Sequence, residues 1–226
     1  IRRPPRSTLF PYTALFRSLR RDARPALTSR ASRLSSSTPM STAPSPYTAR
    51  YPSLAERTVF ISGGASGIGE SLVRAFHAQG AKVGFCDIDS AAGQALAGQL
   101  RGEHPALFLP CDVTDTAALG ATIDAVRSHF GPVGVLLNNA ANDRRHEMAD
   151  VTDEDFDRLV AVNLKHQFFA AQAVAPDMRA LGGGSIVNFG SVSWMMKGRG
   201  YPVYQACKAA VRGLAGLVDQ IGRAHV

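Results

Sequence analysis

The stretch TVFISGGASGIG, residues 58–69, sets the fold class of the chain. Its β-branched and aromatic start predicts a buried strand over 58–62, and apolar residues at helical spacing predict a helix over 70–79. The glycines between them permit a tight turn and a close approach of the backbone to a pyrophosphate, beside the free N–H groups of a helix N-terminus. A plain βα turn would not need this many glycines, so we predict a dinucleotide phosphate site. The residues predicted to form it are Gly63, Ser66, Gly67, Ile68 and Gly69.

Strands and helices are predicted to alternate along the rest of the chain. Strands are expected over 82–87, 106–110, 133–137 and 185–189, and helices over 90–101, over 115–130, from Thr152 to the glycines at 182–184, and around Tyr204. This alternation indicates a parallel sheet. The expected fold class is α/β, a Rossmann-type doubly wound parallel sheet with helices on both faces, over residues 54–220.

Polar residues follow several of these strands, at the edge where open α/β sheets bind ligands. Asp87 ends the second strand, where a carboxylate accepts hydrogen bonds from an adenosine ribose and repels a 2′-phosphate. No Lys or Arg stands beside it, so we predict NAD rather than NADP as the cofactor, while a turn or cap role for Asp87 stays open. Further cofactor contacts are expected from Asp112, Val113, Asn139 and Ala140, while a role for Asp112 as the cap of the next helix stays open.

Tyr204 and Lys208 are four positions apart, which on a helix places both side chains on one face. A free Tyr has a pKa of ~10 and is a poor base at neutral pH, but a lysine ammonium held close favours the phenolate. Tyr204 is therefore a candidate proton-transfer residue, and Ser191 a candidate hydrogen-bond donor to the oxygen of a reacting carbonyl. Taken alone, the pair also fits a solvated Tyr and Lys on a surface helix.

Together these motifs resemble the short-chain dehydrogenase/reductase family, over roughly residues 54–220. The resemblance rests on the glycine loop at 63–69, Asp112-Val113, Asn138-Asn139-Ala140, Asn163, Ser191 and Tyr204-x-x-x-Lys208, in this order. It implies an NAD(P)-dependent oxidoreductase that transfers a hydride between the cofactor and an alcohol or carbonyl. Tyr204 would be the general acid/base, Ser191 would polarise the carbonyl, and Lys208 would bind the nicotinamide ribose. Asn163 would hold the water of a proton relay, while an exposed surface position for it stays open. Tyr204 and Lys208 would thus both contact the cofactor.

The chain departs from the usual family pattern at three positions, with Ser62 in place of Thr, Ala141 in place of Gly, and Cys207 in place of Ser. We interpret Cys207 as a packing residue. It also stops soon after the Tyr204 helix, so we expect the sheet to lack the last strands of the family fold and the chain alone to be inactive. Family members pair through the two long helices that flank the fifth strand. Both helices are present, which predicts a homodimer or homotetramer.

Three short segments resemble the bacterial D-xylose-type aldose dehydrogenases: 51–54, 142–146 and Ser193-Trp194. A Trp ring suits sugar C–H surfaces and amides suit hydroxyls, so substrate contacts are expected from Asn142, Ser193 and Trp194, with His146 nearby. Ordinary loop polarity and one packed Trp explain the same residues. The alternative functions are an NADP-dependent carbonyl or 3-oxoacyl reductase, and an inactive nucleotide-binding fragment.

The net charge of +7 is unevenly distributed. Residues 1–50 hold ten Arg and one acid, whereas residues 51–226 hold 15 Lys and Arg against 17 Asp and Glu, without a basic stripe for nucleic acid. No apolar run approaches the ~20 residues of a membrane span, and the three cysteines have neither disulfide nor metal-ligand spacing. We therefore expect a soluble cytoplasmic protein with a small-molecule substrate, no metal, no nucleic acid and no membrane partner.

Both ends differ in composition from the rest. Residues 1–50 are rich in Arg, Ser and Pro, which predicts a disordered leader. Residues 9–18 and the tail 221–226 resemble translated sequencing-adapter DNA, so we interpret them as artefacts and Met40 as the natural start. The alternative is that residues 19–39 form a mitochondrial transit peptide.

Overall fold

The computed structural model describes residues 49–196 and 198–221, with side chains omitted for 216–221. The predictions for the leader before residue 49 and for the tail after residue 221 lie outside these residues. None of the helices described is both long and apolar enough to cross a membrane.

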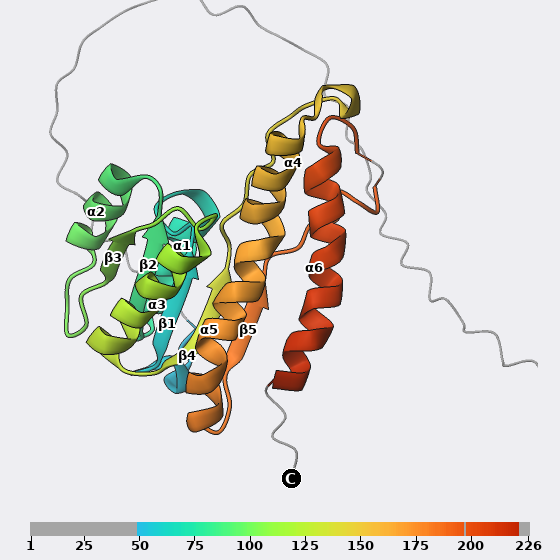
Figure 1. Ribbon diagram of the computed structural model, residues 1–226. Coiled ribbons are helices and arrows are strands. Elements are labelled where there is room, and N and C mark those ends of the chain that lie inside the picture. The colour runs from blue at the N-terminus through green and yellow to red at the C-terminus, as the bar shows by residue number, and fades with distance from the viewer. Residues whose placement is uncertain (1–48, 197, 222–226) are drawn as a thin grey trace, which may run out of the picture. The chain divides into compact units, whose positions relative to one another are not determined.

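One parallel sheet organises the described part of the chain, with its strands in the order β3-β2-β1-β4-β5 (Figure 1). The strand order changes direction between β1 and β4, as in doubly wound Rossmann-type folds, so the predicted fold class is confirmed. The register brings three carboxyl ends level, because Ser62 of β1 pairs with Cys86 of β2 and with Asn138 of β4. The strands are Thr58–Ser62 (β1), Lys82–Asp87 (β2), Leu107–Pro110 (β3), Val133–Asn138 (β4) and Ser185–Asn188 (β5).

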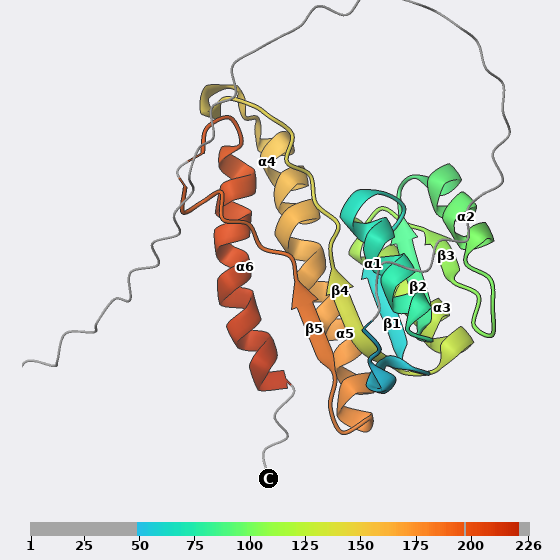
Figure 2. The same cartoon turned by 180° about the vertical axis from the view of Figure 1, so that it is seen from behind.

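Helices pack on both faces of this sheet. On one face α1 and α2 bury Val73 and Leu96 against β1 and β2 (Figure 2). On the other face α3 and α5 bury Ile123 and Val174, and α6 lies beside α4, α5 and β5 (Figure 1). The helices are Gly67–Ala78 (α1), Ser90–Gln99 (α2), Thr116–Phe130 (α3), Asp153–Val160 (α4), His166–Ala180 (α5) and Pro202–Ile221 (α6).

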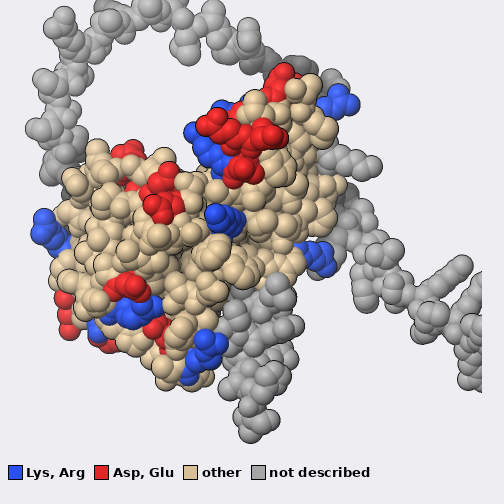
Figure 3. Space-filling view, viewed as in Figure 1, with Lys and Arg blue, Asp and Glu red and all other residues tan. Residues whose placement is uncertain are grey.

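Side chains at the helix starts explain where several of these helices begin. The Asp89 carboxylate caps α2 by accepting from the Ala92 N–H, and the Thr152 hydroxyl caps α4 by accepting from the Asp155 N–H. The first turn of α4 carries three acids at 153–155, which gather near its start in Figure 3. Negative charge there is stabilised by the positive end of the helix dipole.

The long helix predicted from Thr152 has a different backbone near its middle. Between α4 and α5, residues Ala161–Lys165 form a π-helical turn, in which Asn163 is fully buried. Such turns widen a helix by one residue and are frequent at functional sites. Smaller differences concern boundaries, since α1 begins at Gly67, three residues before the predicted start, and α2 ends at Gln99.

Candidate active site

A pocket of about 340 Å³ opens at the carboxyl ends of the strands. The glycine loop with the start of α1, the end of β2, and the segments that follow β3 and β4 line it. Most of the predicted cofactor residues meet here, although they come from four separate segments. The predicted residues that line the pocket are Gly63, Ser66, Ile68, Gly69, Asp87, Asp112, Val113, Asn139 and Ala140.

Close backbone contacts require glycine in the loop. Gly63 has a φ of +67°, and a Cβ on it would lie 2.8 Å from the Cα of Ala140. A Cβ on Gly69 would lie 1.8 Å from the carbonyl oxygen of Gly63. The Asn139 side-chain amide donates to the same oxygen at 2.7 Å, so the loop is fixed to the end of β4.

Ser62 contributes its hydroxyl to this junction. Its Oγ accepts hydrogen bonds from the backbone N–H groups of Asn139 and Ala140, at 3.1 and 3.2 Å. The bonding group is thus the hydroxyl, which Ser62 shares with the Thr that is usual at this position.

The residues of the pocket fit a dinucleotide. The N-cap residue of α1, Ser66, makes no side-chain cap bond, and the first N–H groups of a helix have no intrahelical partner, so this end suits a phosphate. The Asp87 carboxylate lies on the wall of the pocket, where its oxygens accept from the N–H groups of Ala65 (3.0 Å) and Asp89 (3.1 Å). Of the described lining residues, none is Lys or Arg.

Tyr204 and Lys208 lie one turn apart on α6. Lys208 is only 2% exposed, and its Nζ donates to the carbonyl oxygen of Phe189 at 2.6 Å. The Nζ lies 5.5 Å from the centroid of the Tyr204 ring. Burial lowers the pKa of the Lys208 amine below its ordinary value. The amine is thus held between the end of β5 and the Tyr204 ring.

Ser191 and Trp194 lie in the loop that connects β5 to α6. The Ser191 hydroxyl donates to the Ser193 Oγ at 3.0 Å and accepts from the Ser193 N–H at 3.1 Å. Trp194 is half-buried in the same loop. Ser191 and Ser193 therefore lie in contact with one another at the strand end where the sequence places them.

Asn163 joins the π-helical turn to the segment that follows β4. Its Oδ1 accepts from the Asn142 N–H at 2.9 Å, while its Nδ2 donates to the carbonyls of Asn142 (2.9 Å) and Leu159 (3.0 Å). The Asn163 carbonyl accepts from the Gln167 side-chain amide at 3.1 Å. Both N–H groups of the Asn163 side chain are consequently bonded to protein carbonyls.

Several residues at or near this site belong to no motif that predicts them. Cys111 lines the pocket, and the neighbouring Cys86 thiol lowers the pKa of the Cys111 thiol below its ordinary value. His166 is fully buried, and neither of its ring nitrogens has a partner among the described residues. Gln205 donates to two carbonyls of the β5–α6 connection. The only available signals were a Cys directly after a strand and a Gln directly after Tyr204.

The strand order, and a pocket at the point where that order reverses, define a Rossmann-type α/β protein. The family model described as short chain dehydrogenase matches residues 57–223. The chain belongs to the short-chain dehydrogenase family.

Several curated relatives align with most of this chain. It is 44% identical to a D-xylose 1-dehydrogenase of Caulobacter vibrioides over 165 residues, covering 73% of this chain and 65% of the relative. It is 42% identical to a probable galactose dehydrogenase of Rhizobium meliloti, with the same coverage. It is 39% identical to a 3-beta-hydroxysteroid dehydrogenase of Comamonas testosteroni, covering 70% of this chain and 61% of the relative. The chain thus spans less than two thirds of the length of these relatives.

Proposed function

We propose that this chain carries the nucleotide-binding and catalytic parts of an NAD-dependent dehydrogenase that interconverts an alcohol and a carbonyl. The strongest support is the buried Lys208 amine, 5.5 Å from the Tyr204 ring, at the sheet edge that also holds the pocket. When bound, the nicotinamide cofactor supplies or accepts the hydride. Tyr204 transfers the proton at the substrate oxygen, Lys208 stabilises the phenolate form, and Ser191 donates a hydrogen bond to that oxygen.

Asn163 is the proposed fourth member of this set and holds a water of the proton relay. Its two side-chain N–H groups are already bonded to protein carbonyls. A water would therefore donate a hydrogen bond to the Asn163 Oδ1 or to its backbone carbonyl, since each of these oxygens can accept a second bond. The same residue fixes the backbone of Asn142, which we place at the substrate entrance.

Asp87 is the basis for proposing NAD rather than NADP. Its carboxylate lies on the pocket wall, with no Lys or Arg among the described lining residues to neutralise a 2′-phosphate. A ribose diol can donate hydrogen bonds to this carboxylate, whereas a phosphate would be repelled by it.

An aldose is the proposed substrate, with contacts from Asn142, Ser193 and Trp194. Two relatives named for xylose and galactose support this choice. A relative named for a hydroxysteroid favours a second candidate, an alcohol on an apolar ring system. Measuring NAD reduction with a panel of pentoses, hexoses and hydroxysteroids distinguishes the two. Turnover of hydroxysteroids without turnover of any aldose would exclude the sugar proposal.

Tyr204→Phe tests the proposed chemistry in the full-length protein. The change removes only the hydroxyl, and Tyr204 is not among the described residues that line the nucleotide pocket. We expect kcat to fall by at least about 100-fold, the usual contribution of a general acid/base, while NADH binding measured by fluorescence titration stays within twofold. Activity close to that of the wild type would overturn the acid/base assignment.

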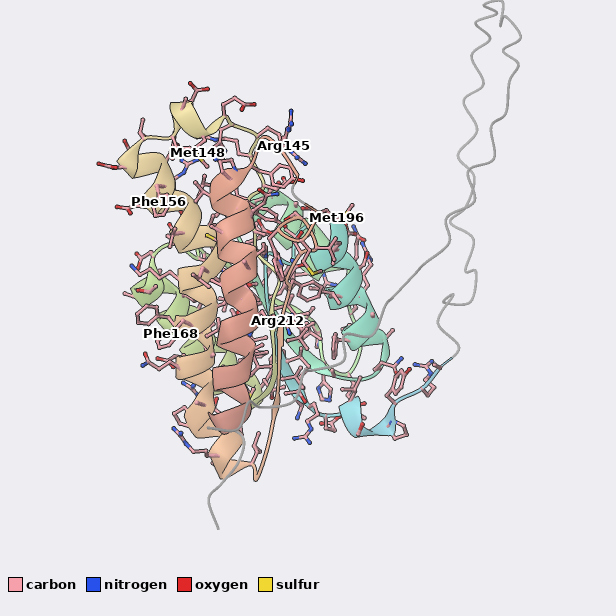
Figure 4. All side chains as sticks on the ribbon, turned by 90° about the vertical axis from the view of Figure 1, so that its right-hand side faces the viewer. Arg145, Met148, Phe156, Phe168, Met196 and Arg212 are labelled. Carbon is pink, nitrogen blue, oxygen red and sulfur yellow. The ribbon has the colours of Figure 1, made fainter. Side chains whose placement is uncertain are left out.

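We also propose that the protein forms a homodimer or homotetramer through α4, α5 and α6. Phe156 and Phe168 are both 47% exposed on the α4–α5 side, and Figure 4 shows them along one flank of the helix pair. Exposed aromatic side chains in a row are typical of a protein–protein contact.

A further inference from the structure

The connection from Ser191 to Gly200 is named here the β5–α6 loop, and its described residues, which exclude residue 197, have little packing of their own. It carries Ser191 and Trp194, and three of its apolar side chains are largely exposed: Val192 (58%), Met195 (55%) and Met196 (75%). A segment with few buried apolar contacts depends on hydrogen bonds for a fixed position. The bonds that hold this loop therefore decide where Ser191 lies.

Gln205 provides two of these bonds from one side chain. Its Nε2 donates to the carbonyl oxygens of Ser193 and Gly198, both at 2.9 Å. These carbonyls lie near the two ends of the loop, and both N–H groups of the carboxamide are used. The side chain thus fastens the loop to the first turn of α6.

Other contacts connect the β5–α6 loop and the start of α6 to the segment that follows β4. The His146 N–H donates to the Gly200 carbonyl at 2.8 Å, which ties the segment after β4 to the end of the β5–α6 loop. The Arg145 guanidinium lies 4.1 Å from the centroid of the Tyr201 ring, and that ring meets the Tyr204 ring edge-on at 6.0 Å. Arg145 and Met196 both lie by the N-terminal end of α6 in Figure 4.

We propose that Gln205 is a positioning residue, whose carboxamide holds the β5–α6 loop so that the Ser191 hydroxyl keeps a fixed place relative to the Tyr204 phenol. Gln205 directly follows Tyr204 on α6. Loss of its two bonds therefore lets the loop move relative to the Tyr204 phenol, while the Ser191 hydroxyl and the phenol themselves stay chemically unchanged. Displacements of about 1 Å in such a pair are enough to slow catalysis strongly. The catalytic part of this inference rests on the proposed function, whereas the holding of the loop does not.

Gln205→Glu is the sharpest test, because it keeps the shape of the side chain and removes both donors. It also places a carboxylate against two carbonyl oxygens. Gln205→Met, which lacks the donors but adds no charge, serves as a second variant if Gln205→Glu fails to fold, as judged by circular dichroism. Gln94→Glu, an exposed position on α2, is the matched control.

Trp194 reports on the loop directly, because it is the only Trp in the chain and lies between the two bonded carbonyls. We expect the rate constant for acrylamide quenching of its fluorescence to rise about twofold or more in both Gln205 variants, and to be unchanged in Gln94→Glu. In the full-length protein, we expect the kcat of both Gln205 variants to fall about tenfold or more relative to the wild type. KM for the cofactor should stay within twofold, since the nucleotide pocket is formed by other segments.

Two results would overturn the proposal. Unchanged Trp194 quenching in folded Gln205 variants would show that the two bonds do not hold the loop. Increased quenching with an unaltered kcat would show that the held loop does not position the reacting groups. Absence of turnover in the wild type would instead count against the proposed function, and the quenching measurement would still decide whether Gln205 holds the loop.

Discussion

Burial changes the chemistry of single side chains in this protein, and His166 is the strongest case. Its imidazole is fully buried at the start of α5. Burial, and to a smaller extent the nearby charge of Lys208, lowers the pKa of His166 to about 4. The folded protein therefore keeps a neutral ring under conditions in which the unfolded chain, with an ordinary His pKa of ~6.5, binds a proton.

This difference predicts that acid destabilises the fold through His166. Above about pH 6.5 the ring is neutral in both states, and between about pH 6.5 and 4 only the unfolded state takes up the proton, so the free energy of unfolding falls as the pH falls. His166→Asn should reduce the loss of stability between pH 7 and pH 5 by about 2 kcal/mol in urea titrations. His129→Asn, at an exposed position, is the control. An identical loss in wild type and His166→Asn would contradict this assignment.

Asp87 gives a second prediction at the residue scale. Asp87→Asn removes the charge that repels a 2′-phosphate but keeps the size of the side chain. We expect the ratio of kcat/KM for NADP to that for NAD to rise about tenfold, which corresponds to about 1.4 kcal/mol. Asp89→Asn removes a neighbouring carboxylate charge but keeps an oxygen that can cap α2, and it should leave this ratio unchanged. An unaltered ratio in Asp87→Asn would count against its contact with the ribose.

At the scale of elements, one carboxylate joins α3, α5 and β4. Asp177 of α5 is buried, and its oxygens accept from the Arg127 Nε at 2.8 and 2.9 Å. The same carboxylate accepts from the Val133 N–H at 3.0 Å, at the start of β4. Pairing and hydrogen bonding together explain why a charged group is tolerated at this depth.

Asp177→Asn should therefore destabilise the protein without affecting the pocket. The amide keeps the shape but loses the charge, and its N–H₂ group faces other donors. We expect the free energy of unfolding to fall by about 2 kcal/mol in denaturant titrations, with cofactor binding retained. Asp143→Asn is the control, because the Asp143–Arg145 pair is 3.4 Å long and exposed, and such pairs contribute little. Equal stability of Asp177→Asn and wild type would contradict this role.

At the scale of the whole molecule, the proposed self-association can be tested on the exposed Phe168. A carboxylate in an apolar contact between subunits would be desolvated and unpaired, so Phe168→Asp should shift the protein to monomers in size-exclusion chromatography with light scattering. Met148→Asp, at a residue that is 76% exposed outside the long helices, should leave the subunit count unchanged. A wild-type protein that is already monomeric would overturn the proposal.

The sequence by itself determined the fold class and the outline of the pocket. Strand and helix periods, and the glycines of residues 63–69, act over short distances along the chain, so their consequences can be read locally. Parallel strands then bring their carboxyl ends to one edge, which is why Asp87, Asp112 and Asn139 could be placed together in advance.

Only the tertiary structure decided how the polar side chains are used. Asn163 bonds the backbone of Asn142, Gln205 bonds Ser193 and Gly198, and His166 is buried close to the charge of Lys208. Each of these arrangements joins segments that are separate in sequence, through the packing of α4, α5 and α6 against the strand ends. Their energies depend on burial and on distances of a few ångströms, which no spacing along the chain specifies.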